Sequence, residues 1–349
     1  MKTDHVSRHI TNEQVEHYGV PVFNASKEAH SCPYIIPLDG NAPQQDSGLI
    51  SELANNNIAL ARSISLQDAS KIFSDLAEHY QLTESYLLQM QFVVDMMEDR
   101  CGVDDVAVTV NEREDYQYIQ PHCEGDSTSP IELFGLYCRK NAQHGGENVL
   151  SRIDQRADFS HVKAKEKAIL GKDLDAAAIR KLQQGHLDAK DVIESCDKVL
   201  RTLSETAQGK VVTRLAPLQK QYSKVSNEQI YTLWDNVTVH DHAFHRLQFD
   251  LLSQLSLIHT QTDNGSSCFS IDAKGSDQYQ SMMHIERDSD WAPADTDSGD
   301  LASTAKLFDT HVIYKMQPGD FLIFNNRAWA HGVNNWNPLE TRELLAMYA

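Results

Sequence analysis

A histidine and a glutamate stand two positions apart in the segment 120–126, where a run of extended character ends. Residues i and i+2 of an extended chain point to the same face. His122 and Glu124 can therefore offer an imidazole nitrogen and a carboxylate oxygen to one metal ion, while Cys123 points away. Because an acidic chain with 16 histidines contains such triplets by chance, this triplet alone is weak evidence for a metal site.

A second segment, 318–333, combines a turn, a strand and a histidine. Pro318, Gly319 and Asp320 predict a turn into the apolar run 321–324, and a polar Asn-Asn-Arg break then precedes His331. Eleven residues after His331 stands Arg342, which leads into a further apolar run. An arginine at such a place can bind a carboxylate through two parallel hydrogen bonds, which a lysine cannot reproduce.

Together the two segments resemble the Fe(II)- and 2-oxoglutarate-dependent oxygenases, specifically the branch with taurine dioxygenase and clavaminate synthase. The resemblance rests on the order HxE, PGDFLIFNNRxxxHG and a following arginine, and it covers about residues 106–151 and 311–349. A glutamate in the triplet looks like clavaminate synthase, asparagine oxygenase, and the arginine and lysine hydroxylases.

The resemblance implies a metal site and a keto-acid site. His122, Glu124 and His331 match the facial triad that binds Fe(II) and leaves three positions open. Arg342 matches the arginine that binds the distal carboxylate of 2-oxoglutarate. Relatives commonly add a threonine after the Gly-Gly turn; here Asn148 would supply an amide donor instead, with Ser151 as a second candidate.

The reaction that the resemblance implies consumes O2 and 2-oxoglutarate, releases succinate and CO2, and hydroxylates an unactivated C–H bond. No catalytic group beyond the iron site is expected. A glutamate at position 124 argues against halogenation, whereas desaturation or ring closure stays open. Asn326 and Arg327 match the polar turn before the second histidine, and bracing of that turn is an alternative role for Arg327.

For the substrate, the sequence favours a small molecule, an amino acid of lysine- or arginine-like character. The acidic segment 286–300 precedes His331 and is expected to form a lid, with Asp288 facing a cationic substrate; a solvated surface loop is the alternative. Gln91 is a candidate for the amino-acid head, or a buried structural amide. Ala346 stands where related amino-acid hydroxylases carry a second arginine, so an ordinary α-carboxylate clamp is in doubt.

Two alternatives follow from these residues. One is the same chemistry on an amino acid tethered to a carrier protein, or on another small metabolite. The other, from a different class, is a non-catalytic cupin-like protein that binds a metal such as zinc or a small ligand through the same three residues.

Composition limits the partners. The 349 residues include 50 acidic and 31 basic side chains, a formal net charge of −19, which disfavours nucleic acid and anionic membranes. No apolar run approaches the length of a membrane span, and no signal-like apolar segment follows Met1, so a cytoplasmic location is expected. The six cysteines form no CxxC pair and are expected to be unpaired thiols.

The hydrophobic period indicates the elements that must position these residues. Helical spacing predicts two helices between Ser65 and Glu98, a helix over 247–259 and two or three surface helices over 158–206. Extended runs are expected at 106–110, 116–121, 131–138, 149–151, 268–271, 311–316, 321–324 and 344–348. These predict a single α+β domain, 1–349, with N-terminal helices, a double-stranded β-helix (jelly roll, cupin-like) core over about 100–155 and 262–349, and a largely helical insertion over about 158–260.

Overall fold

The computed structural model describes the chain in twelve stretches: 15–26, 32–35, 37–39, 45–82, 101–110, 119–125, 131–170, 193–194, 210–239, 241–259, 301–336 and 340–349. Three expectations lie outside these residues: the second helix before Glu98, which includes Gln91, the strand over 268–271, and the acidic segment 286–300, which includes Asp288.

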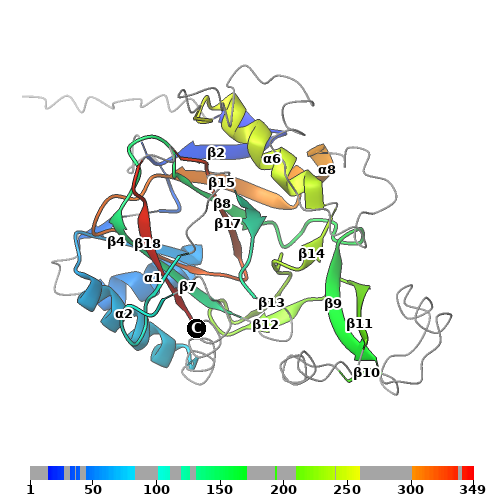
Figure 1. Cartoon of the computed structure of the whole chain (residues 1–349), viewed down its shortest axis with the longest axis horizontal. Helices are drawn as coiled ribbons and strands as arrows, with labels where there is room; N and C mark the ends of the chain where they lie inside the picture. Colours follow the sequence, from blue (N-terminus) through cyan, green and yellow to red (C-terminus); the bar gives the residue numbers. More distant parts are fainter. Residues whose placement is uncertain are drawn as a thin grey trace, which may run out of the picture.

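Two six-stranded sheets form the centre of the molecule (Figure 1). The first has the order β1-β2-β15-β8-β17-β6, with bounds Val15–His17, Val20–Asn24, Phe308–Tyr314, Asn148–Ile153, Trp329–Val333 and Ile119–His122. The second has the order β3-β4-β16-β7-β18-β5, with bounds Pro37–Asp39, Ile58–Arg62, Phe321–Asn325, Leu133–Lys140, Glu343–Tyr348 and Val108–Thr109. Consecutive strands from β5 to β8, and again from β15 to β18, alternate between the two sheets.

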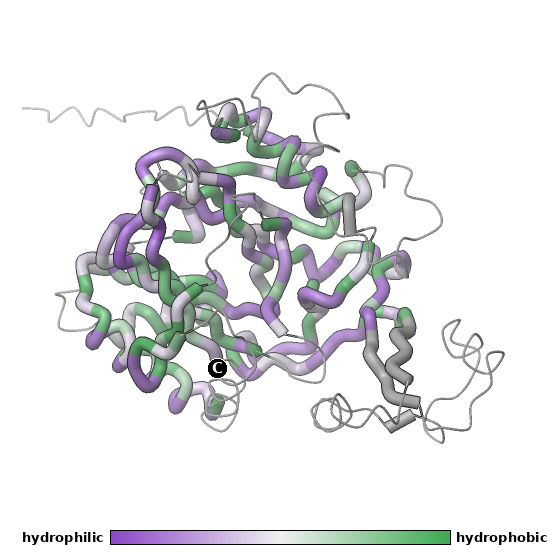
Figure 2. Tube along the Cα trace, in the orientation of Figure 1, coloured by the Kyte–Doolittle hydropathy of each residue, from purple (hydrophilic) through white to green (hydrophobic). Residues whose placement is uncertain are grey.

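The two sheets face each other across a shared apolar core. Phe134 and Phe324 of the second sheet lie in one buried cluster with Leu150 and Trp329 of the first. Figure 2 shows the hydrophobic stretches of the chain running along the strands of these sheets. Side chains alternate between the faces of a strand, so every second residue of β7 and β16 points into this interior.

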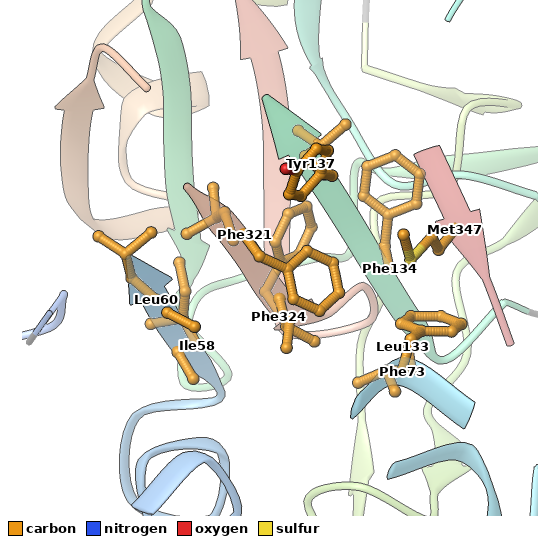
Figure 3. Packing of buried hydrophobic residues seen from close by; sticks show 14 of the residues in the cluster. Ile58, Leu60, Phe73, Leu133, Phe134, Tyr137, Phe321, Phe324 and Met347 are labelled. Atoms are coloured by element: carbon orange, nitrogen blue, oxygen red, sulfur yellow. The ribbon is translucent and has the colours of Figure 1, made fainter. Parts of the chain in front are cut away.

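Helices cover the outer faces of both sheets. α1 (Gln45–Asn56) and α2 (Leu66–His79) lie on the second sheet, and the apolar side of α2 includes Phe73 (Figure 3). Gly135 of β7 allows this contact, because an added Cβ would lie 3.1 Å from Phe73 and 3.0 Å from Phe321. α6 (Asp241–Gln254) packs on the first sheet through Leu251 and Leu252, which share a cluster with residues of β8 and β15. A short helix, α8 (Leu301–Ala305), precedes β15.

The prediction of helices over 158–206 is wrong for the residues that the structure describes there. β9 (Lys163–Leu170) pairs along its whole length with β11 (Lys210–Pro217), and β10 (Ile193–Glu194) and β14 (Val237–Thr238) complete this sheet at one side of the molecule (Figure 1). β12 (Gln221–Ser223) and β13 (Glu228–Ile230) form a separate hairpin. Pairing between residues 40 to 54 positions apart overrides the helix-favouring composition of Lys163–Leu170.

Most other expected elements are confirmed. The helix at Leu66–His79 begins after the N-cap Ser65, whose side chain accepts a hydrogen bond from the Asp68 backbone N–H. The helix expected over 247–259 begins earlier and ends at Gln254. The strands β1 to β4 and β17 were not expected. Of the helices described, none is long and apolar enough to cross a membrane.

Candidate metal centre

Two neighbouring strands bring the two histidines together. β17 pairs antiparallel with β6, and His331 lies directly opposite His122 in the register. Their ring centroids are 4.5 Å apart. Glu124 follows β6, and its Oε1 lies 3.7 Å from Nε2 of His122 and 3.6 Å from Nε2 of His331. Among the described residues, these three form the one group whose potential ligand atoms all lie within 4.8 Å of one another.

A backbone carbonyl orients the first ligand. Nδ1 of His122 lies 2.8 Å from the carbonyl oxygen of Gln120 and donates a hydrogen bond to it. This bond keeps a proton on Nδ1, so Nε2, which faces Glu124 and His331, is the nitrogen that can bind a metal once it has released its own proton. Metal-binding histidines are commonly oriented in this way, so the tautomer of His122 suits a ligand.

Asn326 holds the backbone of Glu124 from the turn before β17. Its Oδ1 accepts a hydrogen bond from the Glu124 N–H (2.9 Å), and its Nδ2 donates to the Glu124 carbonyl oxygen (2.9 Å). Nδ2 also donates to the carbonyl oxygen of Ile131 (2.8 Å). A fully buried amide therefore fixes the position of the carboxylate ligand, a role that the motif alone did not reveal.

The second sheet contributes an aromatic wall behind His331. The ring of Phe134 stacks on the His331 ring at 4.7 Å with an interplanar angle of 25°, and Phe324 lies 5.4 Å away. Both phenylalanines were apparent in the sequence only as apolar strand residues. Their positions restrict the rotation of the imidazole, and the His331 side chain is 11% exposed.

Electrostatics favour a charged carboxylate among the three residues. Burial raises the pKa of Glu124, but hydrogen bonds and charges from His122 and His331 outweigh burial and lower it well below its ordinary value. Burial also lowers the pKa of His122, yet Glu124 outweighs this effect and raises it to about 9. For His331, burial and the charge of His122 lower the pKa. These shifts favour an ionised Glu124 beside a protonated His122, and a divalent cation can replace the His122 proton.

The ligand set fits a hard-to-borderline divalent metal. Two imidazoles and one carboxylate that converge from one edge of a sheet leave further coordination positions open. Iron(II) binds such mixed nitrogen and oxygen ligands, and zinc also accepts them.

Asn148 lies on the same face of the first sheet as His331. His331 is opposite Leu150 in the register of β17 and β8, and Asn148 precedes Leu150 by two residues. Asn148 is 3% exposed, and no described group accepts a hydrogen bond from its buried Nδ2. An unsatisfied buried amide is costly, so a polar ligand that accepts this bond would stabilise the site.

Arg342 lies beside the turn that leads into Asn148. An added Cβ on Gly146 would lie 3.2 Å from Cδ and Nε of Arg342, and the guanidinium carbon lies 5.1 Å from the centre of the Trp336 ring. The structure thus places the two residues expected for 2-oxoglutarate at the same end of β8.

Other expected residues have different surroundings. Ser151 points to the opposite face of β8, where its hydroxyl lies 2.8 Å from Nδ1 of His311, so it is wrong as a keto-acid ligand. Arg327 pairs with buried Glu132 at 3.2 Å and braces the turn. Ala346 is buried opposite Leu136 of β7. Gln91 and Asp288 lie outside the described residues.

No family model and no curated protein matches the chain. Among solved structures, it is similar to PvcB, an Fe, α-ketoglutarate-dependent oxygenase from an isonitrile synthetic pathway, with 10% identity, a TM-score of 0.39, and 90% of this chain and 85% of that chain covered. For PvcB from Pseudomonas aeruginosa, the identity is 11% and the TM-score 0.38, with 90% of this chain and 85% of that chain covered. For a taurine dioxygenase from Burkholderia xenovorans, the identity is 10% and the TM-score 0.36, with 90% of this chain and 86% of that chain covered. Similarity at this level does not establish a common activity, so the function proposed below rests on the residues of the site.

Proposed function

We propose that the protein is an Fe(II)- and 2-oxoglutarate-dependent dioxygenase that hydroxylates an unactivated C–H bond of a small molecule. The convergence of His122, Glu124 and His331 at one edge of a sheet carries this proposal. We further propose that the alternation of strands between the two sheets is that of a double-stranded β-helix, in the manner of the clavaminate synthase-like oxygenases.

The residues of the chain have distinct roles in this proposal. His122, Glu124 and His331 hold the iron, with His122 fixed by the Gln120 carbonyl and Glu124 fixed by Asn326. The bound iron supplies oxygen activation coupled to decarboxylation of the keto acid, which yields succinate and CO2. Arg342 binds the distal carboxylate of 2-oxoglutarate, and the Asn148 amide donates a hydrogen bond to it.

The substrate proposed is an amino acid, with a preference for a basic one. Ala346 leaves no cation four residues after Arg342 for an α-carboxylate, so the same chemistry on a carrier-tethered amino acid is the second candidate. Asp288 and Gln91 remain predictions as substrate ligands.

A metal-binding protein without oxygenase activity is the alternative from another class. Such a protein needs neither a carboxylate clamp nor an unsatisfied amide beside its metal. The buried Asn148 Nδ2 beside Arg342 therefore favours the oxygenase.

Succinate release tests this proposal. The protein is incubated with Fe(II), ascorbate, O2 and 2-oxoglutarate, and the twenty amino acids are offered both free and as carrier-bound thioesters. We expect succinate above the uncoupled background with at least one amino acid, and none with His122→Ala. Turnover of the loaded forms alone would exclude the free amino acid as substrate. Absence of succinate under every condition, with zinc retained by the protein, would favour the metal-binding alternative.

A further inference from the structure

Asp235 lies beside the metal ligand Glu124. Cys123 and Trp234 form a parallel bridge, in which Cys123 N–H donates to the Leu233 carbonyl oxygen (2.8 Å) and Asp235 N–H donates to the Cys123 carbonyl oxygen (2.7 Å). Glu124 and Asp235 directly follow the two residues of this bridge, so their backbones are neighbours at the edge where the proposed metal ligands converge.

Asp235 lies at the edge of the candidate metal centre. The hydrogen bond from its N–H to the Cys123 carbonyl oxygen joins it to the residue that precedes Glu124. Asp235 is outside the group of three whose ligand atoms lie within 4.8 Å of one another. It thus lies beside the centre without being a fourth ligand.

Among the described residues, Asp235 has no cationic partner. Its side chain is exposed and receives no hydrogen bond or ion pair from this part of the chain. Two buried carboxylates of the fold are paired: Glu132 with Arg327, and Glu147 with Lys315 and Asn334. The Asp235 carboxylate, which has no such partner among the described residues, can therefore bind a ligand.

The charges of the loaded centre favour a cation at this place. Iron(II), Glu124 and doubly charged 2-oxoglutarate sum to one negative charge, and Asp235 adds a second. Like charges this close disfavour one another, and a positive group on the substrate offsets them. We infer that Asp235 is a specificity-determining residue that binds the ammonium or guanidinium group of a basic substrate. This inference rests on the proposed function and names a residue for its substrate preference.

Ligand binding to the anaerobic Fe(II)–2-oxoglutarate protein tests the inference by calorimetry. The probes are L-lysine and L-arginine, their methyl esters, which stand for a carrier-bound carbonyl group, and the uncharged analogues L-norleucine and L-citrulline. We expect at least one cationic probe to bind more tightly than its uncharged analogue. Asp235→Asn should weaken that binding about ten- to hundredfold, as for one lost charged hydrogen bond, and Asp235→Glu should restore part of it.

Glu228→Gln is the matched control, because it removes an exposed carboxylate from β13 and should leave all affinities unchanged. Equal binding of the cationic probe to native protein and Asp235→Asn would overturn the inference, as would failure of every cationic probe to bind. If the native protein binds neither Fe(II) nor 2-oxoglutarate, or only one of them, that result would instead contradict the proposed function. The inference alone fails if both bind and no cationic preference is found.

Discussion

At the scale of single residues, the candidate metal centre includes groups that orient the proposed ligands as well as the ligands themselves. The Gln120 carbonyl fixes the tautomer of His122, and the Asn326 amide fixes the backbone of Glu124. Such supporting hydrogen bonds commonly affect metal affinity about ten- to hundredfold.

Asn326→Ala should therefore weaken binding of Mn(II) or Fe(II) about ten- to hundredfold, because Glu124 loses two of the hydrogen bonds that position it. Isothermal titration measures the affinity. Asn325→Ala is the control: this neighbouring asparagine is equally buried but bonds to Asn57 and Ser223. Both variants should lose stability, and equal metal affinities in the two would show that Asn326 does not position the ligand.

A buried histidine away from the metal centre makes stability depend on pH. His311 is 1% exposed, and burial lowers its pKa to about 3. In the unfolded chain the pKa is about 6.5, so between these values the unfolded state binds more protons. The contribution of His311 to the free energy of unfolding is therefore at its full value above pH 6.5. Below that pH the contribution falls by up to about 1.4 kcal/mol per pH unit.

Replacing His311 should flatten that dependence. Denaturant unfolding between pH 7.5 and 5 should show a smaller slope for His311→Asn than for the native chain, even if the variant is less stable throughout. His161→Asn, at an exposed position, should keep the native slope. A native slope in His311→Asn would mean that this histidine does not titrate as described.

At the scale of elements, the turn between β7 and β8 connects the two sheets beside Asn148 and Arg342, the residues proposed to bind the keto acid. Gly146 has a φ of +73°, and an added Cβ would lie 2.7 Å from Oδ1 of Asn141 and 3.2 Å from Arg342. The absence of a side chain therefore allows Arg342 to lie against the backbone that leads into Asn148.

Gly146→Ala should displace Arg342 and raise the Kd of 2-oxoglutarate about tenfold or more, the effect of losing one charged hydrogen bond, while metal affinity is unchanged. Titration of the metal-loaded protein with the keto acid measures this. Gly19→Ala imposes a similar backbone strain, since φ is +80°, but its Cβ would have no neighbour within 4 Å. An unchanged Kd for 2-oxoglutarate in Gly146→Ala would contradict a role of Arg342 in binding the keto acid.

The sequence predicted those elements whose apolar residues follow a local period. β7, β16 and β18 are apolar runs, and α2 has helical spacing and a capping serine. β9 was predicted as helix because its Lys- and Ala-rich composition contains no sign of its distant partner β11. Spacing and motif singled out the three residues that the structure brings together as a candidate metal centre. Phe134 and Asp235 were not, because each reaches the site through a contact with a segment far along the chain.

At the scale of the whole molecule, the proposed metal ligands come from two segments that are far apart in the sequence and adjacent in the first sheet. His122 belongs to an edge strand of the first sheet, His331 to its neighbour near the C-terminus, and Phe134 behind them to the second sheet. A metal that binds only the folded chain stabilises it by about 2.7 kcal/mol at a hundredfold excess over Kd.

Mn(II) should consequently raise the melting temperature of the metal-free protein by several degrees, and EDTA should reverse the increase. Differential scanning calorimetry gives the shift. His122→Ala should melt at one temperature with or without Mn(II), whereas the exposed control His161→Ala should respond like the native chain. A full shift in His122→Ala would place the metal elsewhere.

The most direct measurement is an anaerobic titration of the metal-free protein with Fe(II) in the presence of 2-oxoglutarate, followed in the visible spectrum. Chelation of the iron by the keto acid should produce a weak charge-transfer band that saturates at one Fe(II) per chain, and His331→Ala should produce none while remaining folded. A native protein that binds Fe(II) without forming the band, or a His331→Ala variant that forms it fully, would contradict the assignment of this site.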